Sequence, residues 1–205
     1  MLICCLFVIA WLSVIGHAAT FKSCSTTQIA TLQIAIDRAT EGAYAVVEHL
    51  TANPRGSTLQ TTWFGAFNAT SHSRTLAAFR KFAPDLATTF SYDCSCQSDV
   101  VVATIGGTYG DVKICSVFFN TAVVPATGFR SQWATIIHEA THFRDTLRTY
   151  DHGYGPDLCK QLAISDPARA VTNADNHACF AVAVKDATES VPRNTLRRGS
   201  RMDRH

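Results

Sequence analysis

Apolar residues recur at helical spacing between Ile29 and Leu50, and the small polar residues 25–27 stand directly before them. Steps of three and four residues place apolar side chains on one face of an α-helix, and Ser or Thr is favoured at the residue before a helix begins. Pro54 and Gly56 follow, and both residue types commonly end helices. The pattern therefore predicts a long amphipathic helix that begins after Ser25 and ends at 53–56.

The rest of the chain divides into shorter periodic segments. Alternating or β-branched runs predict strands, and 3.6-residue spacing predicts helices. We expect helices over 73–82 (ended by Pro84), after Ser131, over 158–164 and over 173–186, strands over 88–92, 100–105 and 112–119, and a packed aromatic run at 63–67. This arrangement predicts an α+β fold that is mostly helical and carries a small β-sheet.

The beginning and end of the chain differ from its middle. Residues 6–15 form an apolar run that is too short to span a bilayer, and small residues follow at 16–19, as in a secretory signal peptide. We therefore expect a signal peptide at 1–18, one domain at 19–190 and a basic disordered tail at 191–205. No later segment reaches 18 consecutive apolar residues, so we expect a secreted, extracellular protein with no membrane association once the signal is removed.

Charge and cysteine content narrow the function classes. The formal net charge of +2 comes from the tail, because the chain without residues 193–205 has 13 basic and 15 acidic side chains. A mildly acidic body gives no reason to expect a nucleic-acid partner. Cys4 and Cys5 belong to the expected signal, and six cysteines remain. An even number of cysteines in a secreted protein predicts disulfides, and six cysteines allow about 15 pairings.

One segment predicts a catalytic metal. His138-Glu139-Ala140-Thr141-His142 has two histidines four residues apart, which share one face of a helix. In zinc peptidases, two imidazoles at this spacing bind one zinc ion, and the glutamate between them acts as the general base. The alternative is a helix with two surface histidines and a solvated glutamate.

A catalytic zinc usually has a third protein ligand. The long metzincin pattern requires Gly and His where this chain has Asp145 and Arg148, and Glu189 is a poor thermolysin-type ligand because it lies beside the basic tail. Asp151 and His152 remain as candidates.

The segment 148–155 reads Arg-Thr-Tyr-Asp-His-Gly-Tyr-Gly. With the preceding helix motif, it resembles the aspzincins, the deuterolysin and peptidyl-lysine metalloendopeptidase family, whose pattern is Gly-Thr-x-Asp-x-x-Tyr-Gly. Arg148 replaces the first Gly, where an unusual φ angle is expected. The resemblance implies a zincin-like fold, one Zn²⁺ per chain and a set of site residues. These are His138, His142 and Asp151 as zinc ligands, Glu139 as the general base and Tyr154 as a hydrogen-bond donor to the oxyanion.

Two further segments carry the resemblance. Residues 92–96 with Cys115 resemble the family's disulfide-braced hairpin, which implies the pairs Cys24–Cys94 and Cys96–Cys115 and leaves Cys159 with Cys179. Residues 173–177 resemble the segment that lines the S1′ pocket, which implies that Asp175 contacts the substrate. The lysine-specific members have a second acidic residue where this chain has Ala178. We therefore expect a weakened preference for Lys or Arg at P1′, or a broader pocket.

Two functions stay open at this point. The leading hypothesis is a secreted, monomeric zinc endopeptidase that acts on polypeptides and holds the substrate backbone along an edge strand, for which we expect 112–119. The alternative is a secreted binding or effector-like protein that keeps the fold and cleaves little. Arg148 and Ala178 favour the alternative, and the intact Glu139 argues against it.

Overall fold

The structure is a computed structural model, and it describes residues 18–123 and 131–190. The expected basic tail and all of the expected signal peptide except Ala18 lie outside these residues, and both stay predictions.

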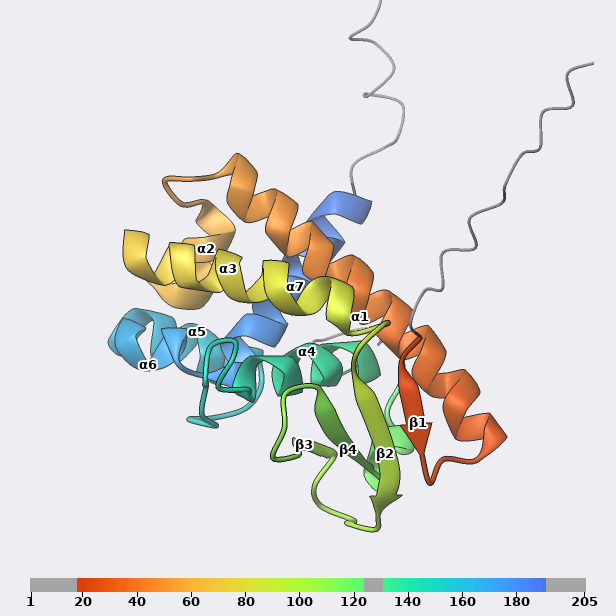
Figure 1. The fold of residues 1–205 in the computed structure, drawn as a ribbon. Coiled ribbons are helices and arrows are strands. Elements are labelled where there is room, and N and C mark those ends of the chain that lie inside the picture. Colours follow the sequence, from red (N-terminus) through yellow and green to blue (C-terminus); the bar gives the residue numbers. More distant parts are fainter. Residues whose placement is uncertain (1–17, 124–130, 191–205) are drawn as a thin grey trace, which may run out of the picture.

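The fold is mostly helical with one small sheet, which confirms the predicted fold class (Figure 1). The strands are β1 (Thr20–Lys22), β2 (Ser91–Cys96), β3 (Ala103–Ile105) and β4 (Asp111–Cys115). The helices are α1 (Thr26–Ala52), α2 (Thr58–Phe64), α3 (Ala69–Asp85), the 3₁₀ helix η1 (Ser116–Asn120), α4 (Gln132–His142), α5 (Pro156–Ser165), α6 (Pro167–Val171) and α7 (Ala174–Glu189).

Helix α1 forms where the apolar periodicity predicts it. The Ser25 hydroxyl accepts a hydrogen bond from the Gln28 N–H, and the Gln28 side chain accepts one from the Ser25 N–H. This reciprocal capping box satisfies two backbone donors that the helix leaves unpaired. The buried face of α1 contacts α3, α4 and α7, so α4 lies at the centre of the molecule between the sheet and the other long helices (Figure 1).

The order of the strands in the sheet is β1-β2-β4-β3. β1 pairs in parallel with β2, β2 pairs in parallel with β4, and β3 pairs antiparallel with β4. The prediction that 112–119 is an edge strand is therefore wrong, because β4 is paired on both sides and 116–120 is 3₁₀ helix. The edge strand that contacts α4 is β3.

Two other expectations from the sequence are only partly correct. The helix over 73–82 is longer than predicted: α3 continues through Pro84 to Asp85, and the Leu86 N–H still donates to the Phe82 carbonyl. Phe82 and Leu86 are fully buried, so packing stabilises the final turn beyond the proline. In the aromatic run 63–67, Trp63 and Phe64 are buried at the end of α2, but Phe67 is 42% exposed.

Two of the three expected disulfides are present. Cys24–Cys94 and Cys96–Cys115 are bonded, and they tie β2 to the start of α1 and to β4. The expected Cys159–Cys179 disulfide is wrong: both residues are free thiols with their Sγ atoms 3.9 Å apart, against about 2.03–2.05 Å for a bond. Among the described residues, none of the helices combines the length and apolar character needed to cross a membrane.

Candidate metal centre

Helix α4 presents both motif histidines on one face. Ser131 caps it as predicted, since its hydroxyl accepts a hydrogen bond from the Ala134 N–H. Apolar residues around the motif pack into the core, and His138 and Glu139 are only 7% and 5% exposed. The burial fixes the direction of these two side chains before any ligand binds.

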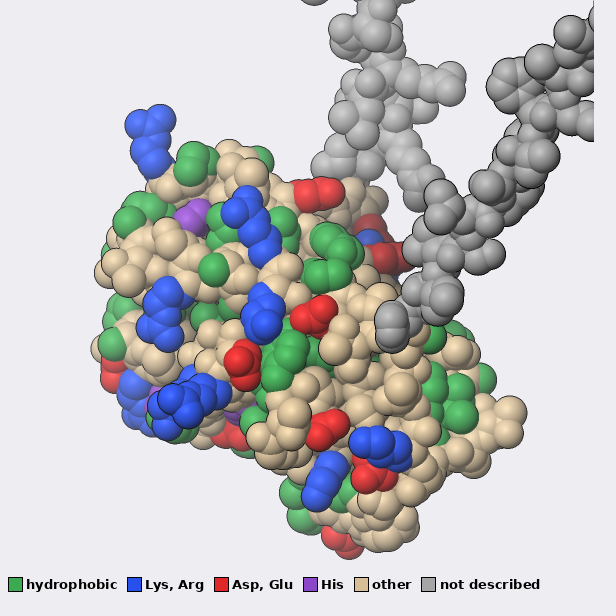
Figure 2. Space-filling view, viewed as in Figure 1, with side chains coloured by type: hydrophobic (Ala, Val, Ile, Leu, Met, Phe, Trp, Pro, Cys, Tyr) green, Lys and Arg blue, Asp and Glu red, His purple; other side chains and the backbone are tan. Residues whose placement is uncertain are grey.

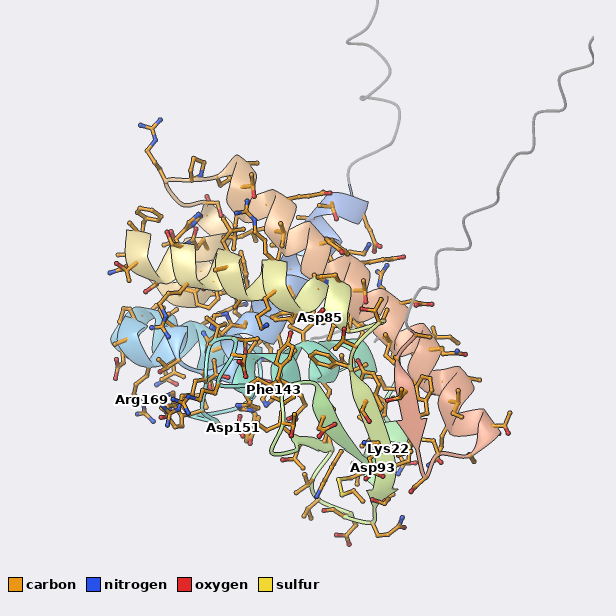
Figure 3. The ribbon with its side chains drawn as sticks, in the orientation of Figure 1. Lys22, Asp85, Asp93, Phe143, Asp151 and Arg169 are labelled. Atoms are coloured by element: carbon orange, nitrogen blue, oxygen red, sulfur yellow. A yellow bond between two sulfur atoms is a disulfide. The ribbon has the colours of Figure 1, made fainter. Side chains whose placement is uncertain are left out.

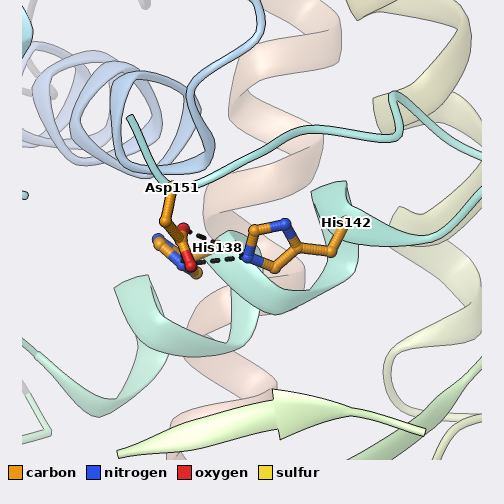
Figure 4. A group of neighbouring side chains, drawn as sticks. All are labelled: His138, His142 and Asp151. Atoms are coloured by element: carbon orange, nitrogen blue, oxygen red, sulfur yellow. Dashed lines mark hydrogen bonds and ion pairs between the residues drawn. The ribbon is translucent and has the colours of Figure 1, made fainter. Parts of the chain in front are cut away.

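The chain after α4 turns back and places Asp151 against the two histidines (Figure 4). Asp151 Oδ1 lies 3.1 Å from His138 Nε2 and 3.4 Å from His142 Nε2, and the two Nε2 atoms are 3.1 Å apart. These three residues are one of the groups of described side chains whose arrangement could hold a metal ion.

The donor set fits zinc. His138 Nδ1 is hydrogen-bonded to Asp175 at 2.9 Å and His142 Nδ1 to the Thr149 carbonyl at 3.0 Å, so both rings carry their proton on Nδ1. Their Nε2 lone pairs therefore converge with a carboxylate oxygen, and such a cluster needs a cation. Three ligands about 2.0–2.2 Å from one tetrahedral ion would lie roughly 3.4 Å apart, which is close to the observed spacing.

The charges of the site support the same assignment. Burial disfavours the His138 imidazolium, but the Asp151 and Asp175 carboxylates outweigh it and raise the His138 pKa to about 10. Hydrogen bonds from His138 and His142 lower the pKa of Asp151. The carboxylates thus favour positive charge at the two histidines, and a bound metal ion would supply that charge.

Two more groups lie at the cluster. Burial raises the pKa of Glu139, which moves a carboxylate toward the range where it can exchange protons near neutral pH. Tyr154 is 59% exposed, and its ring is stacked 6.0 Å from the His138 ring. Burial and the nearby Asp151 carboxylate raise the Tyr154 pKa to about 12, so its hydroxyl keeps its proton and can donate.

The backbone that carries Asp151 is held by a residue whose role the motif did not reveal. Asn173 is fully buried, and its Oδ1 accepts hydrogen bonds from the N–H groups of His152 and Gly153. Its amide nitrogen donates to the Gly153 carbonyl. Its one sequence signal was its position two residues before Asp175.

Arg148 has the backbone conformation that the family's glycine would suit. Its φ angle is 53°, in the left-handed region that favours glycine. The turn therefore forms despite the substitution, at a cost in backbone strain of about 1 kcal/mol.

Two other candidate residues, Asp175 and His152, lie next to the cluster and make different contacts. The Asp175 carboxylate contacts His138, and its second oxygen accepts a hydrogen bond from the Gly155 N–H at 2.5 Å. Asp175 therefore holds the His138 ring through Nδ1, the nitrogen that does not face Asp151. His152, the competing candidate for the third ligand, forms a hydrogen bond with Thr172 and is absent from the ligand cluster.

Glu189, the candidate for a thermolysin-type ligand, forms an ion pair with Arg38.

The surface beside the site carries positive charge. Figure 3 places Arg169 close to Asp151, and Figure 2 shows several Lys and Arg side chains gathered on that side of the molecule. The Arg169 guanidinium lies 3.5 Å from His152 Nδ1. Arg169 therefore places a positive charge near the cluster, which itself contains carboxylates.

Comparison with known proteins finds related peptidases. A family model described as lysine-specific metallo-endopeptidase matches residues 49–182. A peptidyl-Lys metalloendopeptidase of Pleurotus ostreatus is 34% identical over 164 residues, which cover 80% of this chain and 96% of that protein. An extracellular protease of Aeromonas hydrophila is 31% identical, but the chain spans only 45% of its length.

A solved structure shows the same fold. The zinc peptidase from Grifola frondosa matches with a TM-score of 0.71 and 31% sequence identity, over 77% of this chain and 96% of that one. The family model matches the part of this chain that holds the His-Glu-x-x-His helix, Asp151 and Tyr154, and the Pleurotus relative covers 80% of the chain. The chain therefore belongs to the aspzincin family of zinc metalloendopeptidases.

Proposed function

We propose that the chain is an endopeptidase whose zinc ion is held by His138, His142 and Asp151. The convergence of two Nε2 atoms and one carboxylate oxygen within 3.4 Å of one another carries this proposal. Asp175 and the Thr149 carbonyl accept hydrogen bonds from the two Nδ1–H groups, and such contacts fix ring orientation and strengthen binding.

When bound, zinc would supply Lewis-acid polarisation of the scissile carbonyl and of the attacking water. Glu139 accepts the proton of that water and returns it to the leaving amine, because its carboxylate is buried beside the two histidines with a raised pKa. The attack adds oxygen to the carbonyl carbon, and the C–N bond then breaks.

Removal of the metal should abolish cleavage. We expect a denatured protein substrate to be cut by the zinc-loaded chain, left intact after treatment with a chelator, and cut again when Zn²⁺ is restored. Fragments would be followed by mass spectrometry. Cleavage that persists in the chelator would contradict a metal mechanism, and no cleavage under any condition would favour the secreted binding protein.

Tyr154 donates a hydrogen bond to the oxyanion in this proposal. Its place beside His138 and its raised pKa support the role. Replacement by Phe keeps the ring and removes the donor, so we expect kcat to fall about 10²–10³-fold with KM nearly unchanged. Tyr150→Phe, an exposed tyrosine of the same loop, is the matched control. Equal kcat in both variants would remove Tyr154 from the reaction.

The substrate backbone would pair with β3 rather than with β4. The Cys115 N–H donates to the Val102 carbonyl and the Gly106 N–H to the Asp111 carbonyl. Because backbone groups alternate in direction along a strand, Ala103 and Ile105 direct theirs to the open edge. An extended peptide can add to this edge as another strand, next to the helix that carries the proposed ligands.

We propose a residual rather than strict preference for Lys or Arg at P1′. Asp175 offers one carboxylate whose oxygens already bond His138 and Gly155, and the second acidic position is the buried Ala178. The Arg169 guanidinium near His152 further weakens the attraction for a cationic side chain.

Restoring the missing carboxylate should sharpen this preference. We expect Ala178→Glu to raise the proportion of cuts before Lys about tenfold, since one charge-assisted hydrogen bond contributes about 1.5–3 kcal/mol. Cut sites would be mapped on a denatured protein digest. Ala187→Glu, an exposed position of the same helix, should leave the pattern unchanged. A pattern that ignores basic residues in both variants would exclude α7 from the P1′ contact.

We also propose that the protein acts outside the cell. The two disulfides that tie β2 to the start of α1 and to β4 support this location, because such bonds persist in oxidising compartments. The Aeromonas relative is named an extracellular protease. Expression of the full chain in a secreting host tests it, and retention of the protein inside the cells would contradict it.

A further inference from the structure

The two free thiols lie directly behind the metal centre. Cys159 on α5 and Cys179 on α7 are 0% and 2% exposed. Together with an oxygen of Asp175, their sulfur atoms form a second group whose ligand atoms all lie within 4.8 Å of one another. The peptidase mechanism uses neither sulfur.

The spacing of the sulfurs suits a shared metal ion. The Sγ atoms are 3.9 Å apart in the thiol–thiol contact. Two thiolates that bind one tetrahedral ion at about 2.3 Å would be separated by roughly 3.8 Å, whereas a disulfide would bring them to about 2.0 Å. The side chains therefore need little movement to bind a metal and a larger one to bond each other.

The surroundings suit a pair that is neutral until a metal arrives. The Asn173 amide nitrogen lies 3.7 Å from Cys159 Sγ and can donate to it. The contact with Cys159, together with burial, raises the pKa of the Cys179 thiol. Metal uptake would release the thiol protons, as it does at other thiolate sites.

We propose that Cys159, Cys179 and Asp175 form a second metal site, for a thiophilic divalent ion such as Cd²⁺ or excess Zn²⁺, and that filling it inhibits the enzyme. Asp175 has one carboxylate, which already bonds His138 Nδ1 and the Gly155 N–H. An ion on the sulfurs would compete for that carboxylate and loosen His138. The inhibition rests on the proposed function, whereas the binding does not.

The test is a Cd²⁺ titration of the zinc-loaded full chain that keeps its Cys24–Cys94 and Cys96–Cys115 disulfides and carries Cys4→Ser and Cys5→Ser, so that Cys159 and Cys179 are its free thiols. Thiolate coordination gives an ultraviolet charge-transfer band, and the ligands proposed for catalysis contain no sulfur. We expect the band to saturate at one Cd²⁺ per chain while cleavage falls about 10–100-fold, the usual cost of losing an outer hydrogen-bond partner of a metal ligand. Cys159→Ser, Cys179→Ser and the double variant should keep the basal cleavage rate and lose both the band and the inhibition.

Several results would overturn the proposal. They are the absence of the band in the chain that keeps Cys159 and Cys179 as thiols, its persistence in the double variant, and a purified protein whose intact mass shows these two cysteines already oxidised to a disulfide. Because the band of the chain whose free thiols are Cys159 and Cys179 decides the binding, variants of these two that fail to fold do not remove the test. A band without any loss of cleavage would overturn the coupling through Asp175. A band in a chain that cleaves nothing would support the site and contradict the peptidase function.

Discussion

Replacement of Glu139 by Gln should lower kcat/KM by roughly 10²–10⁴-fold while the protein keeps its zinc and its stability. Gln has the same shape as Glu but cannot accept a proton from the attacking water. Glu139 suits the role of general base, because it is 5% exposed and its burial raises its pKa. The measurement is the rate of peptide cleavage, with zinc content determined on the same samples.

Glu48→Gln is the matched control for this variant. Glu48 is an exposed residue of α1, and the same chemical change there should leave the rate unchanged. A Glu139→Gln protein that holds its zinc and cleaves at the wild-type rate would show that another group is the base.

The second large effect is expected from Asp151→Ala. The change removes one of three proposed ligands, so zinc affinity should fall by more than the roughly 100-fold that outer contacts cost, and cleavage should be lost with it. Zinc at about 100 times its Kd should stabilise the wild type by roughly 2.7 kcal/mol, and this increase should vanish in the variant. Competition with a chromogenic chelator and thermal unfolding with and without zinc measure both effects.

Asp145→Ala provides the comparison, because Asp145 is exposed and lies outside the ligand cluster. It should bind zinc as the wild type does. An Asp151→Ala protein with undiminished zinc affinity would assign the third ligand to another residue.

The proposed ligand cluster was predictable because its two histidines lie close together in the sequence. Residues four apart on a helix share a face regardless of the remaining fold, and the Asp151 segment follows within nine residues. The strain at Arg148 was also foreseeable, since a glycine pattern marks a φ that only glycine adopts freely. Its φ of 53° bears this out.

What sequence reasoning missed depends on contacts between distant segments. The inner position of β4 follows from pairing with β2 and β3 on either side, which no period along one strand reveals. Asp175 lies 37 residues from His138, and only the packing of α7 on α4 shows that its carboxylate supports this ring. The unbonded state of Cys159 and Cys179 likewise depends on how α5 and α7 approach each other.

An anomalous difference map at the zinc absorption edge, from crystals of the zinc-loaded chain, would locate the metal independently of any activity. We expect a peak about 2.0–2.2 Å from His138 Nε2, His142 Nε2 and a carboxylate oxygen of Asp151, and no peak at that place in Asp151→Ala crystals grown with the same zinc. A zinc ion bound away from these three side chains, or one that leaves Asp151 beyond coordination distance, would contradict this expectation.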